Sequence, residues 1–216
     1  MLRYLIGHRG ASGYEPENTL RSLSRAFRDG ANAVELDLRA TADGRIVVIH
    51  DRTLDRTTDG EGRVDELGFQ EIRSLDAGDG ERIPTFDEVL DLARGSGGTI
   101  FAEVKVRGFE EEILSAVHEK GAEDIVVFFG IRAAIERIHD LDPSMPCTYP
   151  GNFRVGVSPL TRENITEMHD RDLALIHGDI DDESEMSRLI DLGLDGIITN
   201  YPVRLSRVFR NHGRGG

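Results

Sequence analysis

The chain has 216 residues, 38 % of them hydrophobic, a length and composition typical of one globular domain with a substantial core. Forty acidic and 26 basic residues give a formal net charge of −14, which disfavours nucleic acid and anionic membranes as partners. No stretch approaches the ~18 apolar residues of a membrane span. Because the first residues run directly into a strand-like segment, without a signal peptide, we expect a cytoplasmic protein.

The basic residues are almost all arginine, and only Lys105 and Lys120 are lysines. An acidic chain with so little lysine indicates a high-salt cytoplasm. Cys147 is the single cysteine, so no disulfide framework is expected, and we interpret it as a small buried apolar residue. The sequence leaves the oligomeric state open.

Short apolar runs alternate with amphipathic segments along the whole chain. The strand-like runs are Tyr4–Ile6, Ala33–Leu38, Arg45–Ile49, Thr99–Val106, Asp124–Phe129, Met145–Tyr149, Arg154–Val157, Leu173–Ile176 and Gly196–Thr199. Helical spacing follows the caps predicted at Asn18, Thr85 and Thr161, and recurs around Ile113, Ile135, Met186 and Val203–Phe209. About eight β–α units predict an α/β (β/α)₈ TIM barrel, with a doubly wound open sheet as the alternative. The irregular stretch His50–Gly68 is either a loop over an active site or a surface excursion.

Two acidic residues break the pattern of the strand expected at 33–38. Side chains alternate between the faces of a strand, so Glu35 and Asp37 share the face opposite Val34 and Leu36. In a barrel the apolar face meets the helices and the acids point inward. Two inward carboxylates repel each other and lose solvation, and a divalent cation, Mg²⁺ or Ca²⁺, is the simplest compensation.

The strand expected at 99–106 repeats this arrangement. Glu103 and Lys105 share one face, which makes Glu103 a candidate third ligand and Lys105 a point charge suited to phosphate. Arginine fills nearly every other cationic position, so the lysine here stands out. Periodicity alone also allows two edge strands whose polar faces lie in water.

Two histidines end apolar runs at positions where a barrel carries its active site. His8 is followed by Arg9 and Gly10, and His50 follows the run that ends at Ile49. Imidazole exchanges protons near neutral pH, so the two histidines are candidate acid–base groups, although a single strand-end histidine is usually structural. Arg9 beside a glycine could hold a phosphate.

The ordered motifs of the chain resemble those of the glycerophosphodiester phosphodiesterase family. The matching segments are His8-Arg9-Gly10, Pro16-Glu17-Asn18-Thr19, Glu35-Leu36-Asp37, Asp43-Gly44, His50-Asp51, Leu54–Gly60, Ile83-Pro84-Thr85, Glu103-Val104-Lys105 and Leu192–Pro202. Their order and spacing hold over residues 8–105 and 192–202, whereas the middle of the chain matches weakly.

The resemblance implies one catalytic barrel over residues 1–216, of the phospholipase-C-like phosphodiesterase type and without a large inserted cap domain. It implies hydrolysis of a small-molecule glycerophosphodiester to glycerol phosphate and an alcohol. The implied roles are an acid–base pair (His8 and His50), ligands of a divalent cation (Glu35, Asp37 and Glu103), phosphate-binding cations (Arg9 and Lys105), and a substrate or supporting hydrogen bond (Asn18).

The chain departs from the family near its seventh strand. Gly178–Asp181 replaces a Trp-containing family segment, the protein has no tryptophan, and Asn200 stands where the family usually has Asp. The leaving alcohol is therefore open. Two alternatives keep the same barrel: a lysophospholipase D type enzyme, which would need an apolar groove for acyl chains, and a degenerate barrel that binds phosphoesters without cleaving them.

Overall fold

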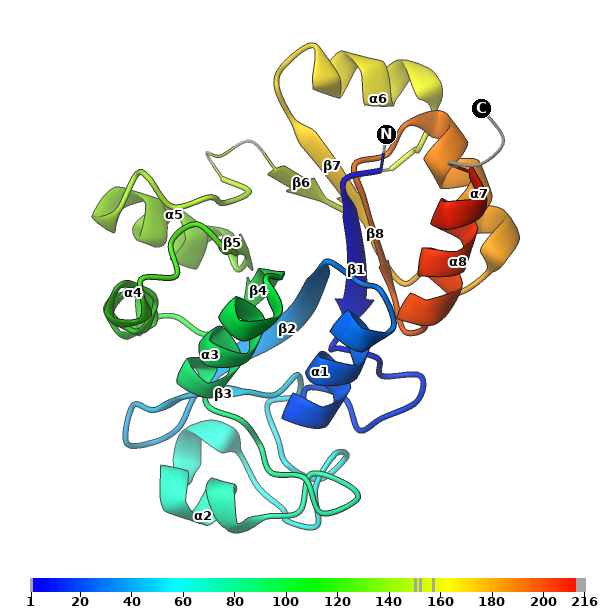
Figure 1. Cartoon of the computed structure of the whole chain (residues 1–216). Coiled ribbons are helices and arrows are strands. Elements are labelled where there is room, and N and C mark those ends of the chain that lie inside the picture. The colour runs from blue at the N-terminus through cyan, green and yellow to red at the C-terminus, as the bar shows by residue number, and fades with distance from the viewer. Residues whose placement is uncertain (1, 150, 152, 157, 213–216) are drawn as a thin grey trace.

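Figure 1 shows the computed structural model of the chain, which describes residues 2–149, 151, 153–156 and 158–212. Within these residues one sheet has the strand order β5-β4-β2-β1-β8-β7-β6, and β3 is attached to β2. The strands are β1 (Tyr4–His8), β2 (Ala33–Ala40), β3 (Ile46–Val48), β4 (Thr99–Val104), β5 (Val126–Gly130), β6 (Phe153–Val155), β7 (Ala174–His177) and β8 (Gly196–Thr199). The helices are α1 (Leu20–Arg28), α2 (Phe69–Ser74), α3 (Phe86–Ser96), α4 (Glu110–Lys120), α5 (Arg132–Leu141), α6 (Arg162–His169), α7 (Glu183–Leu192) and α8 (Pro202–His212), with a 3₁₀ turn, η1 (Val64–Glu66).

The sheet is nearly closed into a barrel, which confirms the predicted (β/α)₈ architecture. All pairings are parallel except that of β3 with β2. The strand expected at Met145–Tyr149 is reduced to a single parallel bridge between Cys147 and Phe128. Pro146 explains the difference, because its nitrogen has no hydrogen to donate to a ladder. The strand expected at Arg154–Val157 is observed as β6, and Val157 lies outside the described residues.

The run predicted as a strand at Arg45–Ile49 forms β3, which is not one of the parallel barrel strands. The chain turns at Gly44, whose φ is +81°, and β3 runs back along β2 with Ile46 opposite Ala40 and Val48 opposite Leu38. The N–H of Ile49 then donates to the carbonyl of Asp37 over 3.0 Å. The reversal therefore delivers His50 beside the middle of β2.

Residues 46–85 are here called the β3–α2 lobe. In Figure 1 the part of this lobe around α2 lies past the arrowhead of β1. The lobe has its own cluster of buried apolar side chains, made of Val47, Ile49, Leu54, Val64, Ile72, Ala77 and Ile83. The irregular stretch expected at His50–Gly68 thus belongs to a packed unit, with η1 near its end and α2 directly after it.

The barrel core has an inner and an outer layer, as the alternation along β2 predicted. Val34 and Leu36 pack outward in one large cluster with residues of α1 and α3, such as Leu23 and Val89. Ala33, on the opposite face, belongs to the inner cluster with Ile6, Phe101, Val127, Ile176 and Ile198. Glu35 and Asp37 lie on this inner face of β2. Cys147 is fully buried, as expected.

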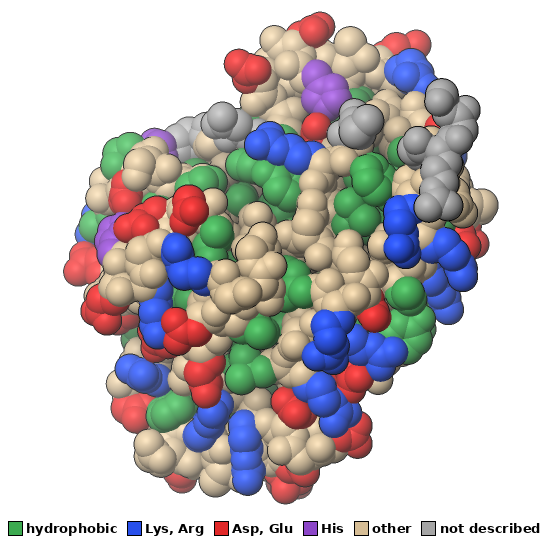
Figure 2. Space-filling view, in the orientation of Figure 1, with side chains coloured by type: hydrophobic (Ala, Val, Ile, Leu, Met, Phe, Trp, Pro, Cys, Tyr) green, Lys and Arg blue, Asp and Glu red, His purple; other side chains and the backbone are tan. Residues whose placement is uncertain are grey.

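Acidic and basic side chains intermingle over the face drawn in Figure 2, so the net negative charge is spread over this surface. Thr85 and Thr161 cap α3 and α6, as predicted from their positions before helical spacing. Among the described residues, none of the helices is both long enough and apolar enough to cross a bilayer.

Candidate active site

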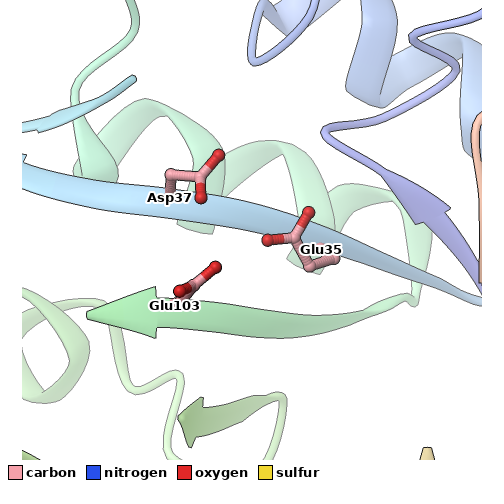
Figure 3. Close-up of side chains that lie close together, drawn as sticks. All are labelled: Glu35, Asp37 and Glu103. Carbon is pink, nitrogen blue, oxygen red and sulfur yellow. The ribbon is translucent and has the colours of Figure 1, made fainter. Parts of the chain in front are cut away.

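Three carboxylates lie close together on β2 and β4, as Figure 3 shows for Glu35, Asp37 and Glu103. Asp37 pairs with Glu103 in the sheet register, and Glu35 pairs with His8 of β1. One oxygen of each carboxylate lies within 4.8 Å of the others. The polar faces of two neighbouring strands therefore bring the three predicted ligands into one cluster.

Two carboxylates of this cluster are almost fully buried. The side chains of Glu35 and Asp37 are 3 % and 1 % exposed. Burial raises the pKa of Glu35 well above its ordinary value, and the charge of Asp37 adds to the rise. Asp37 Oδ1 is buried and accepts no hydrogen bond from the described residues, although the Lys105 ammonium lies 3.2 Å away. This oxygen-only donor set fits a hard divalent cation.

The two cations predicted to bind phosphate border the same carboxylates. Lys105 Nζ lies 3.1 Å from Glu103 Oε2 as well as 3.2 Å from Asp37 Oδ1. Arg9 Nε lies 3.4 Å from Asp37 Oδ2, and its Nη1 donates to Glu17 Oε1 over 2.9 Å. Each side chain thus carries positive charge to the edge of the acidic cluster.

Asn18 has a different local role from the predicted helix cap. The cap of α1 is Thr19, whose hydroxyl accepts from the N–H of Ser22, whereas Asn18 is buried in the left-handed region with φ +58°. Asn18 Nδ2 donates to Asp37 Oδ2 over 2.8 Å, and its Oδ1 is a second buried oxygen without a hydrogen-bond partner among the described residues. Asparagine tolerates this backbone conformation better than most residues do. The amide therefore fixes Asp37 and presents a further oxygen beside it.

His8 lies at the end of β1 with its two ring nitrogens in different surroundings. Nδ1 is 2.9 Å from Asn200 Oδ1 and 3.2 Å from Asp179 Oδ1, while Nε2 is 3.8 Å from Glu35 Oε2. Asn200 Nδ2 donates to Asp181 Oδ2 over 2.7 Å, so its Oδ1 is the atom left to accept from His8. This assigns the proton to Nδ1 and leaves the Nε2 lone pair facing the carboxylates.

His50 is held by a carboxylate of its own. Its Nδ1 is 2.6 Å from Asp51 Oδ1, and Arg56 donates to Asp51 Oδ2 over 2.6 Å. The hydrogen bond from Arg56 lowers the pKa of Asp51 well below its ordinary value, and the hydrogen bond to His50 acts in the same direction. An ionised Asp51 accepts from the Nδ1 side of the ring and so fixes the orientation of His50. Arg56 also donates to Glu17, the partner of Arg9.

The sequence reasoning missed the carboxylates that orient the two histidines. Asp51 and Arg56 stood within matched motifs but received no role, and the available signal was the place of Asp51 directly after His50. Asp179 and Asp181 stood in the segment that departs from the family pattern. Asn200, which replaces the usual Asp, contacts His8 and donates to Asp181. The two departures from the family pattern therefore belong to the same hydrogen-bond network around His8.

The family assignment can be made by comparison with known proteins. The model of the glycerophosphoryl diester phosphodiesterase family matches residues 8–139. The chain belongs to this family. A glycerophosphodiester phosphodiesterase of Bacillus subtilis is 30 % identical, covering 96 % of this chain and 86 % of its own length. A glycerophosphodiester phosphodiesterase of Caldanaerobacter subterraneus subsp. tengcongensis is 32 % identical, covering 99 % of this chain and 100 % of its own.

Solved structures support the same assignment. A glycerophosphodiester phosphodiesterase of Agrobacterium tumefaciens superposes with a TM-score of 0.88 at 25 % identity, over 96 % of this chain and 100 % of that one. An Oleispira antarctica phosphodiesterase, solved with the product sn-glycerol-3-phosphate, superposes with a TM-score of 0.86 at 28 % identity, over 95 % of this chain and 96 % of that one. The barrel of the family is therefore shared along nearly the whole chain.

Proposed function

We propose that this protein hydrolyses glycerophosphodiesters to glycerol phosphate and an alcohol. The observation that carries the proposal is the cluster of Glu35, Asp37 and Glu103 bordered by His8, whose ring is oriented by hydrogen bonding. Such a site combines a place for a cation with proton exchange next to it. The names of the relatives, and the product bound in the Oleispira antarctica enzyme, point to the same reaction.

The acidic cluster is proposed to hold one divalent cation, Mg²⁺ or Ca²⁺. Glu35, Asp37 and Glu103 would be its protein ligands, and the unpartnered oxygen of Asp37 supports this role. When bound, the ion would neutralise charge on the phosphodiester and favour attack at phosphorus. Asn18 holds Asp37 in place through its amide N–H.

His8 and His50 are proposed to be the acid–base pair. One imidazole takes the proton of the glycerol hydroxyl beside the phosphodiester while that oxygen attacks phosphorus. The other gives a proton to the oxygen of the leaving alcohol as the P–O bond breaks. Water then opens the cyclic glycerol phosphate with the two roles exchanged. Asn200 and Asp51, which contact the Nδ1 atoms, leave each Nε2 available for proton transfer.

Arg9 and Lys105 are proposed to bind the phosphate. Both lie at the edge of the acidic cluster, and both have side chains only one-sixth exposed, so their charges act in a partly desolvated space. The reaction would take place in one catalytic domain over residues 1–216, in the cytoplasm.

A substrate panel with released glycerol phosphate as the readout tests the proposal. Glycerophosphodiesters and lysophospholipids are compared with and without EDTA, followed by Mg²⁺ or Ca²⁺, at low and high salt. We expect glycerol phosphate from the diesters, loss of release with EDTA, and recovery with metal. No release under any condition would overturn the function, and preferred cleavage of lysophospholipids would replace it with the lysophospholipase D activity.

A further inference from the structure

A basic pocket adjoins the acidic cluster at the C-terminal ends of β2, β4 and β5. It has a volume of about 340 Å³ and its lining includes four cationic side chains, Arg39, Arg52, Lys105 and Arg107. Its one acidic lining residue is Asp65, which is already bound by Arg63 over 2.6 Å. The pocket is therefore positively charged in a protein whose formal net charge is −14.

The arginines of this pocket lack the carboxylate partners that many other arginines of the protein have. Among the described residues, Arg39, Arg52 and Arg107 form no ion pair. Arg39 donates only to the carbonyls of His50, over 2.7 and 2.9 Å, and of Lys105, over 3.5 Å. Three such side chains in one pocket repel one another unless an anion lies between them.

A second pocket, of about 610 Å³ on the other side of His50, shows the opposite arrangement. Its lining carboxylates are already satisfied by the protein. Glu15 is bound by two arginines, Glu17 is bound by Arg9 and Arg56, and Asp79 is bound by Arg21. Asp76 accepts backbone N–H groups. Asp59 also lines this pocket and accepts from the backbone N–H of Asp76. Unlike in the basic pocket, the charged side chains that line this one are mainly carboxylates.

The basic pocket shares Lys105 with the proposed site. Lys105 lines it and also lies 3.1 Å from Glu103, a proposed cation ligand. Arg39 spans the pocket's inner edge between the backbone of His50 and that of Lys105. Phe109 and Ile131 supply an apolar wall. A group attached to a phosphate bound by Lys105 would therefore lie next to this pocket.

We propose that the basic pocket binds a negatively charged leaving alcohol, so that the protein prefers glycerophosphodiesters whose alcohol carries a carboxylate or a further phosphate. This inference rests on the proposed function. The anionic end would lie among Arg39, Arg52 and Arg107, and the carbon atoms between it and the phosphodiester would lie against Phe109 and Ile131. Charge complementarity in a partly enclosed pocket gives specificity of this kind.

Three diesters that share the glycerophosphate half test the proposal. Their alcohols are 1-propanol, 3-hydroxypropionate and choline, and all three release the same glycerol phosphate. We expect kcat/KM to be about fivefold higher for the 3-hydroxypropionate diester than for the propanol diester, since one partly screened charge contact gives up to about this factor. The choline diester should fall below both.

The double variant Arg52→Gln/Arg107→Gln should bring the ratio of the anionic to the neutral diester close to one. Arg28→Gln is the matched control, because Arg28 lies on α1 and contacts Ser24, and it should keep the wild-type ratio. An equal rate for the two diesters in the wild type, or an unchanged ratio in the double variant, would overturn the inference while the proposed hydrolysis stands. No release from any of the three diesters would overturn both.

Discussion

Replacing Asp181 by asparagine tests whether the tautomer of His8 is set by the hydrogen bonds that orient its partner, Asn200. Asp181 accepts from Thr199 Oγ1 over 2.9 Å, from the backbone N–H of Asn200 over 2.9 Å, and from Asn200 Nδ2 over 2.7 Å. An asparagine at position 181 has one carbonyl oxygen for these three donors and adds an amino group that needs an acceptor. The Asn200 amide is then held by the Ser12 hydroxyl, which can accept as well as donate, so the amide can turn and present its nitrogen to His8.

The size of the effect follows from the bond that is lost. A hydrogen bond to a charged group contributes about 1.5–3 kcal/mol, and each 1.4 kcal/mol corresponds to about a factor of ten. Asp179, 3.2 Å from His8 Nδ1, is then the main group left to favour a proton on Nδ1. The weaker bias raises the fraction of the tautomer that carries its proton on Nε2, which cannot accept a proton from the substrate. We therefore expect Asp181→Asn to lower kcat by about 10- to 100-fold, with a loss of about 1–2 kcal/mol in the free energy of unfolding.

The assay measures kcat and KM from glycerol phosphate release across pH, together with thermal melting by circular dichroism. Asp124→Asn is the control, because the Asp124 side chain is 76 % exposed and pairs only with Arg94. The expected result is a fall in kcat at nearly constant KM in protein that is still folded. A wild-type kcat in folded Asp181→Asn protein, or an activity loss that equals the unfolded fraction, would refute the reasoning.

The remaining predictions concern the acid–base pair, the acidic cluster and the Asp51 ion pair. His8→Ala and His50→Ala should each lower kcat by about 10²–10⁴-fold with an unchanged circular dichroism spectrum, and wild-type turnover in either would contradict its role. Glu35→Gln removes one of two buried like charges, so it should raise the melting temperature in EDTA by a few degrees. It should also abolish the increase in melting temperature that Mg²⁺ gives to the wild type. Equal melting temperatures of variant and wild type in EDTA would argue against repulsion between the buried carboxylates. The pKa of Asp51 is lower in the folded protein than its ordinary value of 3.8. The pairing of Asp51 therefore stabilises the fold at pH values above 3.8, and this stabilisation is lost as the pH falls through the lowered pKa. Arg56→Gln should therefore cost about 0.5–1 kcal/mol at pH 7, a value discounted for the exposure of Arg56, and urea unfolding from pH 7 to pH 2 should show this difference shrinking below pH 3.8.

The acidic cluster could be predicted from sequence because its geometry is local. Alternation along a strand fixes which side chains share a face, and β2 and β4 need only lie side by side for Asp37 to meet Glu103. The inward direction of Glu35 and Asp37 followed from the apolar residues between them. The same reasoning identified Lys105, which contacts both strands' carboxylates.

The surroundings of the histidines could not be predicted in this way, because they depend on contacts between distant segments. His50 was chosen as the end of a barrel strand, yet it reaches the site because β3 reverses along β2. Asp181 follows β7 and meets Asn200 after β8, so this contact depends on how two loops of the barrel approach each other. Strand periodicity predicts neither the reversal of β3 nor the contact between these two loops.

The β3–α2 lobe supports one half of the site with an apolar cluster of its own, while β3 stays hydrogen-bonded to β2. His8, Glu35 and Glu103 belong to strands of the barrel, whereas His50 and its carboxylate follow β3 and are supported by the lobe's own apolar cluster. A unit with its own core can open at a lower free energy than the whole fold, and hydrogen exchange detects such openings residue by residue. Warming would then abolish activity through opening of the lobe while the barrel keeps its secondary structure. The upper temperature of activity would be set by the packing around Ile72 and its neighbours, and strengthening the barrel would not raise it.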